Sequence, residues 1–336
     1  MKGKYGIILS VFIGLVVFMT ACGEKSQEQI TDKLTKQVTE LDSYSAVAEM
    51  TMNTGQEEQK YVIDVLYKAD HFYRIHLQNA NDQGESQRII KNDDGVFVLT
   101  PEQEKTFKFQ SDWPENGSQA YLYQSLVNDV LKDAGASFHA SEDYYVYHVA
   151  ANYQNSHQLP RQEIFFNKKT LSPALVNVYD QDEDTIVSVQ FKEFKFNPEL
   201  SLSEFEVEEN AAESIAELDE RSEDVEFEVL YPLETLGAEL TDQKEVYLDD
   251  GKRILMVFSG EKNFTLVQER RMAEASFSEV YDVKGELLHL GSLLAGISDS
   301  SVEWTANGVE YYLASEELSK EELIEIAMSV QGREIK

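Results

Sequence analysis

The feature that most constrains the fold is a hydrophobic pattern with a period of two that recurs along much of the chain. Apolar and polar residues alternate in segments such as "KYVIDVLYK" and "FYRIHL". This alternation is typical of strands that bury one face and keep the other in water, as many antiparallel sheets do. Short turns separate the segments, and in "NDDG" the residue Gly95 can accept the positive φ of a bulged turn. The sequence therefore predicts an antiparallel meander from Tyr44 to Phe196.

Two segments with helical periodicity accompany this meander. Residues 27–41 place apolar side chains at spacings of three and four, on one face of a helix. Residues 118–135 predict a second amphipathic helix, with Ser118 as its N-cap and Gly135 at its C-terminal stop. Two helices can cover one face of a long antiparallel sheet only if the sheet curves around them. We therefore expect a mainly β protein in which an open, strongly curved sheet wraps around helices.

The inner face of this sheet allows two interpretations. The chain is rich in aromatic residues, with 17 Phe and 17 Tyr. Such side chains either pack as an ordinary core or line an apolar cavity that admits a ligand. The candidate cavity residues occupy alternate positions on two neighbouring strands: Tyr61, Ile63, Val65, Tyr67, Tyr73, Ile75 and Leu77.

The composition divides the chain into parts. Residues 208–228 are dominated by Asp and Glu and are interpreted as an interdomain linker that can hold one short helix. Residues 229–336 return to strand patterns and end in a helix that begins with a capping box of Ser319 and Glu322. We expect residues 22–207 to form the larger domain and the C-terminal part to form a smaller α+β domain.

The only cysteine, Cys22, directly follows an apolar run at the N-terminus. Lys2 and Lys4 precede an apolar run of about 15 residues, which is shorter than the roughly 20 that a transmembrane helix needs. A basic start, a short apolar segment and small residues before a cleavage point are typical of a secretory signal peptide, here residues 1–21. The alternatives are an uncleaved N-terminal anchor and a buried core thiol.

The residues Met19, Thr20, Ala21 and Cys22 resemble the lipobox of bacterial lipoproteins. This resemblance implies that Cys22 carries a thioether-linked diacylglycerol and becomes the first residue of the mature protein. Each buried methylene contributes about 0.8 kcal/mol, so two or three acyl chains attach a protein firmly to a membrane. The mature chain would contain no other cysteine, which leaves no intramolecular disulfide to stabilise it.

The charge of the chain limits its partners. With 62 acidic and 29 basic residues, the net charge is −33. Such a chain cannot gain affinity for nucleic acid by releasing counterions from phosphates, and it is repelled by an anionic membrane surface. Lipid must therefore supply the membrane attachment. The excess of acid either serves solubility or indicates a basic partner.

No catalytic motif is recognisable in the sequence. It contains no G-x-S-x-G elbow, no H-E-x-x-H motif and no glycine-rich phosphate loop. Asp180, Asp182 and Asp184 have the initial spacing of a calcium loop, but Thr185 and Phe191 occupy the positions of its Gly and Glu. The histidines lack metal-ligand spacing: His71, His76, His139, His148, His157 and His289. We therefore expect a non-enzymatic protein without a metal site or a cofactor.

The order of the elements allows a comparison with known families. An N-terminal helix leads into "LDSYSAVAEMTM", "YKADHFYRIHL", "DDGVFVLTPEQEKTFKF", "EIFFNKKTLSPALVNVYD" and "VSVQFKEFKFNPELSLSEFEV". This order resembles the LolA/RseB-like superfamily, the lipoprotein-carrier fold, in which an unclosed β-barrel wraps around helices. Together with "WTANGVEYYLASEELSKEELIEIAMSV", the layout resembles the YdcC-type sporulation lipoproteins of Gram-positive spore-formers. LolA itself is soluble and single-domain, so the resemblance does not imply shuttling to an outer membrane.

Two functional hypotheses follow from these features. In the first, the chain is a lipoprotein on the outer face of the cytoplasmic membrane that binds a lipid-like ligand or a lipidated or envelope protein. In the second, it is an interaction or regulatory lipoprotein that holds a cell-wall enzyme or a signalling ectodomain. The link to sporulation comes from the resemblance alone, and neither hypothesis involves nucleic acid.

Overall fold

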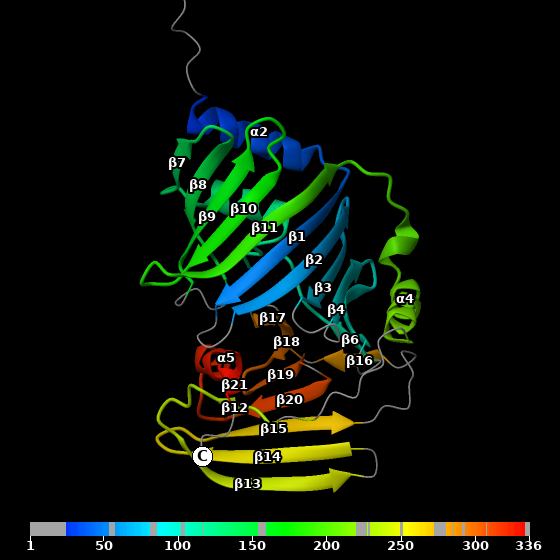
Figure 1. Cartoon of the computed structure of the whole chain (residues 1–336), viewed down its shortest axis with the longest axis vertical. Coiled ribbons are helices and arrows are strands. Elements are labelled where there is room, and N and C mark those ends of the chain that lie inside the picture. The colour runs from blue at the N-terminus through cyan, green and yellow to red at the C-terminus, as the bar shows by residue number, and fades with distance from the viewer. Residues whose placement is uncertain are drawn as a thin grey trace, which may run out of the picture.

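The structure is a computed structural model of the chain. It describes residues 25–53, 58–80, 86–101, 105–115, 117–153, 159–219, 227, 229–248, 251–271, 280–283, 285–290, 293–306 and 308–332. Two curved sheets and four α-helices make up most of these residues (Figure 1).

A twelve-stranded sheet forms the upper part of the molecule (Figure 1). Its strand order is β16-β6-β5-β4-β3-β2-β1-β11-β10-β9-β8-β7. Neighbouring strands from β1 to β11 are antiparallel, and the sheet is not closed, because β16 and β7 remain at its ends. The strands are β1 (Ser43–Asn53), β2 (Glu58–Lys68), β3 (Phe72–Asn79), β4 (Ser86–Asn92), β5 (Gly95–Thr100), β6 (Lys105–Phe109), β7 (Ser137–Ala140), β8 (Tyr144–Ala150), β9 (Arg161–Asn167), β10 (Pro173–Tyr179), β11 (Thr185–Phe196) and β16 (Val280–Val283). The predicted open, curved antiparallel sheet is confirmed.

Helices α2 (Gln27–Thr39) and α3 (Tyr123–Lys132) pack on the concave face of this sheet. Helix α2 begins with a capping box of Ser26 and Gln29, and its buried residues Ile30 and Leu34 lie on the predicted face. Helix α3 buries Leu126, Val127 and other side chains in the same core. The first predicted helix is therefore confirmed with its buried face.

The predicted N-cap of the second helix was wrong. Helix α3 has Leu122 as its N-cap, and no side chain caps its first turn by a hydrogen bond. The Ser118 Oγ instead accepts a hydrogen bond of 2.8 Å from the Asn152 backbone N–H, and the Ser118 N–H donates to the Asn152 carbonyl. Because this loop occupies the serine hydroxyl, it is not available to cap a helix.

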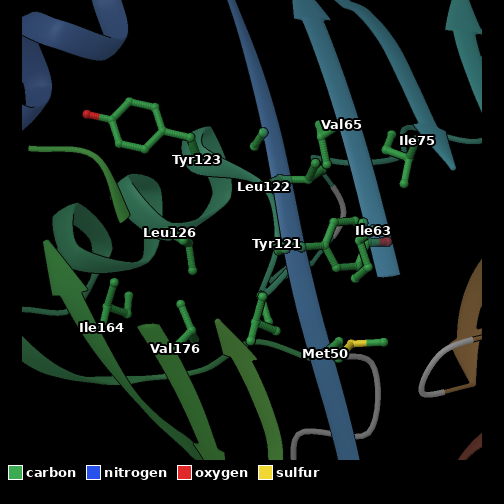
Figure 2. Packing of buried hydrophobic residues seen from close by; sticks show 14 of the residues in the cluster. Met50, Ile63, Val65, Ile75, Tyr121, Leu122, Tyr123, Leu126, Ile164 and Val176 are labelled. Atoms are coloured by element: carbon green, nitrogen blue, oxygen red, sulfur yellow. The ribbon is translucent and has the colours of Figure 1, made fainter. Parts of the chain in front are cut away.

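The concave face is filled by apolar side chains (Figure 2). Ile63, Val65 and Ile75 from β2 and β3 lie in one cluster with Tyr121 and Leu122 from the segment that leads into α3. All five side chains are at most 3% exposed. Burial on this scale makes the core the main stabilising element of a chain that forms no intramolecular disulfide.

A seven-stranded antiparallel sheet forms the second domain, in the lower part of Figure 1. Its strands, in spatial order, are β13 (Glu239–Leu248), β14 (Gly251–Ser259), β15 (Phe264–Arg271), β20 (Val309–Ala314), β19 (Ser301–Ala306), β18 (Leu293–Ile297) and β17 (Glu286–Leu290). Helix α5 (Lys320–Met328) starts with the predicted capping box and packs Leu323 and Ile326 into the core of this domain. A short pair, β12 (Tyr231–Pro232) and β21 (Val330–Gly332), lies next to α5. The predicted α+β character is confirmed.

The first part of the acidic segment is a packed helix. After a 3-10 turn (Leu202–Phe205), helix α4 (Val207–Asp219) lies beside β4 and buries Asn210 and Ser214. The buried Arg88 of β4 donates hydrogen bonds to the Asn210 carbonyl at 3.1 Å and to Glu213 Oε2 at 2.9 Å. Ala211 and Val207 also pack against Ile90, Phe97 and Leu99 of β4 and β5. Sequence patterns do not reveal this packing, because the strand residues that hold the helix lie more than 100 residues away. The domain boundaries remain an interpretation.

The two domains share a sheet through β16. This strand lies between β15 and β17 in the sequence, yet it pairs with β6 of the first sheet. Their pairing is parallel and places Tyr281 opposite Phe107 and Val283 opposite Phe109. The C-terminal domain therefore contributes an edge strand to the N-terminal one.

Candidate functional site between the two domains

A cleft between the two domains encloses about 230 Å³. One wall comes from β4, β5 and β6 of the large sheet, and the other comes from β15, β18, β19 and β20 of the second sheet, with β16 between them. This volume is below the range of about 300–1,000 Å³ that is typical of small-molecule pockets. The cleft therefore suits one or two side chains of a partner better than a large free ligand.

Gln87 of β4 ties the two walls together. Its side chain is 4% exposed. The Gln87 Nε2 donates to the Thr305 carbonyl at 3.3 Å, and its Oε1 accepts from the Leu294 N–H at 3.0 Å. Each such hydrogen bond contributes about 1 kcal/mol net, and losing one partner leaves a buried polar group unsatisfied. The amide thus fixes β4 against β18 and β19.

An ion pair closes the same junction. The Lys105 ammonium on β6 pairs with the Glu310 carboxylate on β20. It also lies 5.6 Å from the centre of the Tyr281 ring on β16. A cation over an aromatic face is attracted by about 0.5–1 kcal/mol at an exposed site. One lysine therefore connects three strands around the cleft.

Strand register arranges the second wall in two rows. Val267, Tyr312 and Glu303 are directly opposite one another on β15, β20 and β19. The next row contains Glu269, Glu310 and Thr305. The intervening residues of these strands point to the other face, where they form the core with α5. The cleft face therefore combines apolar side chains with three carboxyl groups.

The three carboxyl groups differ in their partners. Glu269 is 8% exposed and accepts from Arg253 Nε at 2.6 Å, and Glu310 pairs with Lys105. In the part of the chain that the structure describes, no hydrogen bond or ion pair is found for Glu303. Although Glu303 is an exposed residue, partial desolvation by its surroundings raises the pKa of its carboxyl, and the negative charge of Glu310 raises it further. Glu303 is thus an acceptor that a cationic or hydrogen-bonding group of a ligand would stabilise.

The seven predicted cavity residues do not lie in this cleft. Each is at most 7% exposed and belongs to the filled core of the concave face. They are Tyr61, Ile63, Val65, Tyr67, Tyr73, Ile75 and Leu77. A ligand could reach them only after α3 and the segment before it had moved. Their role as a cavity stays a prediction.

The predicted lipidation site lies outside the described residues. This holds for Cys22 and for the lipobox residues Met19, Thr20 and Ala21. Within the described ranges, no helix has the length and apolar character to span a bilayer.

No metal-binding group of three or more His, Cys, Asp or Glu side chains occurs among the residues with a described position. The Asp180 Oδ1 accepts the backbone N–H groups of Asp182 and Asp184, both at 2.9 Å. Asp180 thus stabilises a turn with its own side chain. The rings of His139 and His148 stack with centres 5.5 Å apart.

Sequence patterns miss most of the cleft for an identifiable reason. The alternation in "SSVEWTANGVEYYLAS" places Glu303, Glu310 and Tyr312 on one face of a hairpin, so their shared orientation was available. The sequence does not show which face of the first sheet these residues meet, because Gln87 and Lys105 belong to strands about 200 residues away in the sequence. Periodicity tells which residues share a face but not which faces meet.

The raised pKa of Glu303 gives a pH-dependent prediction. A carboxyl whose pKa rises on folding destabilises the protein once the pH passes above the ordinary value of 4.5 and the group ionises. We expect Glu303→Gln to raise the free energy of unfolding at pH 7 and to leave it unchanged near pH 4, as measured by urea unfolding. The matched variant Glu310→Gln removes the counter-ion of Lys105 and should lower stability at pH 7 by about 1 kcal/mol. A Glu303→Gln variant less stable than the wild type at pH 7 would contradict this electrostatic assignment.

Comparisons with known proteins identify relatives of this chain. A family model described as "Sporulation protein YdcC-like" matches residues 2–205. Sporulation protein YdcC of Bacillus subtilis (strain 168) is 42% identical over 336 residues, which cover 99% of this chain and 98% of that protein. A chain of the Pseudomonas aeruginosa MucA/MucB complex is 12% identical with a TM-score of 0.33, and the match covers 91% of this chain and 100% of that one. The LolA superfamily protein NE2245 from Nitrosomonas europaea is 12% identical with a TM-score of 0.30, over 55% of this chain and 100% of its own. On the family model and the Bacillus relative, the chain belongs to the YdcC-like sporulation protein family.

Proposed function

We propose that this protein is a non-enzymatic, lipid-anchored binding protein of the sporulating cell envelope, and that it holds a protein partner in the cleft between its domains. Membership of a sporulation family and the LolA-like open sheet support a binding role. The partner is a protein on the outer side of the cytoplasmic membrane. A cell-wall enzyme and a signalling ectodomain are the two candidate classes.

One contrast within the structure carries this proposal. The concave face, where a lipid-like ligand would have to lie, is packed with side chains from α3 and the segment before it. The cleft instead combines an accessible volume, apolar walls and the acceptor Glu303, for which the described residues provide no partner. Tyr312, at the mouth of the cleft, is 41% exposed. Exposed aromatic residues next to apolar surface are typical of protein interfaces.

The anchor is the second part of the proposal. Cys22 follows a short apolar segment and ends a lipobox-like sequence. A net charge of −33 opposes direct contact of the protein surface with anionic lipid, so acyl chains are needed for attachment. An anchored body samples only partners within reach of its tether, which favours an envelope protein over a freely diffusing one.

Photo-crosslinking tests for a partner in the cleft. A photoreactive phenylalanine analogue is introduced at Tyr312 in one wall and, separately, at Phe107 in the other wall, in cells undergoing sporulation. We expect the same protein to be cross-linked from both positions, because one occupant contacts both walls. The matched control is Tyr247 on β13, which is 77% exposed but lies away from the cleft lining. Adducts are identified by mass spectrometry.

Two outcomes of this experiment would contradict a protein partner in the cleft. The first is an adduct whose mass is that of a lipid, which would favour the lipid-carrier hypothesis instead. The second is a protein adduct from Tyr247 with none from Tyr312 or Phe107, which would move the interface to the outer strand of the second sheet.

Metabolic labelling tests the anchor. We expect radiolabelled palmitate to enter the wild-type protein and the Cys22→Ser variant to incorporate none, because serine cannot form the thioether. The labelled protein should sediment with membranes and lack residues 1–21 in its mass spectrum. Unlabelled wild-type protein that retains its first 21 residues would show that the N-terminal segment is an uncleaved anchor.

A further inference from the structure

Strand β16 differs from its neighbours in how it is bound. It is four residues long, and among the strand pairs of the described residues its pairing with β6 is the one parallel pair. Parallel pairing is slightly less stable per residue than antiparallel pairing. Val280 and Tyr281 of this strand are 46% and 39% exposed. The edge of the large sheet is therefore covered by a short, half-exposed strand.

The contacts of β16 define what the β6 edge can accept. Tyr281 places its ring 5.9 Å from that of Phe107 and beneath the Lys105 ammonium. Asp282 is in register with Lys108 on the opposite face of the pair. Although the protein is strongly acidic, this edge presents two lysines. It therefore suits a segment that carries an aromatic residue followed by an acid.

Val283 occupies a niche that a glycine creates. A Cβ atom on Gly296 of β18 would lie 2.7 Å from Val283 Cγ1 and 3.4 Å from Phe109 Cε1. The first distance is shorter than real Cβ contacts, so any larger residue at position 296 would force Val283 to shift. Val283 also lines the cleft described above. Removing β16 would therefore open the niche and widen the cleft together.

We propose that the edge of β6 is a strand-acceptor site for an extended segment of the protein partner, and that β16 fills it in the absence of that partner. The incoming segment forms main-chain hydrogen bonds with β6 and places an aromatic residue over Phe107, an acid beside Lys108 and a small apolar residue against Gly296. This is strand addition, in which backbone pairing supplies affinity and side-chain niches supply specificity. The inference rests on the proposed function for the nature of the occupant.

A peptide with the β16 sequence tests the site without the natural partner. The probe is fluorescein-labelled EVYDVKG, residues 279–285. The acceptor is the full-length chain with Cys22→Ser, Tyr281→Ser and Val283→Ser, in which the internal strand has lost the side chains that contact Phe107 and the Gly296 niche. We expect this variant to bind the probe at least about tenfold more tightly than the Cys22→Ser chain, because an intact internal strand competes at high effective concentration. The control probe carries serine at the positions of Tyr281 and Val283.

An engineered disulfide between β6 and β16 compares the covered and the open edge within one protein sample. Lys108→Cys and Asp282→Cys are added to the acceptor, because facing Cα atoms of neighbouring strands lie about 4.8 Å apart, within the reach of a disulfide. Oxidation should abolish probe binding, and reduction of the same sample should restore it. Equal binding in both states, or no gain in the acceptor variant, would overturn the strand-acceptor site. The assay contains no cellular protein, so its failure leaves the cleft partner to be decided by cross-linking.

Discussion

The structure depends on one constraint, which is that a long curved sheet must bury its concave face. Helix α3 and the segment before it provide the buried surface, with Leu122, Tyr123 and Leu126 fully inside the core. A fully buried leucine contributes about 1.5–3 kcal/mol, and a chain with a single cysteine has no intramolecular disulfide to replace that energy. Because the helix occupies the interior of the sheet, a ligand must either displace it or bind elsewhere.

The second domain provides a candidate binding site away from the concave face. The domains meet through a buried amide, an ion pair and a shared strand. Leu287 of β17 and Leu294 of β18 also belong to the apolar core of the large sheet, so the junction combines polar and apolar contacts. The same junction leaves a volume lined by apolar side chains and by Glu303, which has no partner among the residues that the structure describes. The filled core and the candidate recognition site therefore lie in different parts of the molecule.

Sequence patterns predicted the elements of this fold better than their assembly. Strand and turn patterns located β1 to β6 and β8 to β11, helical spacing located α2, and a capping box located α5, whereas the four-residue β7 was not predicted. The start of α3 was missed because the loop carbonyl and amide of Asn152 hold Ser118. The packing of α4 was missed because Arg88 lies far away in the sequence. The cleft could not be predicted at all, since it depends on which sheet faces meet and on a four-residue strand, β16, that carries too short a pattern to recognise.

The central claim is that the concave face is closed and that a partner binds in the cleft. Hydrogen exchange of the full-length protein tests this claim most directly. The amides of α3 should be protected to the same degree as those of β2, so that both exchange only through global unfolding. The amides that pair β16 with β6 should exchange much faster, because that strand opens locally. Exchange of α3 far ahead of β2 would show that the helix leaves the sheet readily. That result would contradict a closed interior and restore the concave face as the binding site.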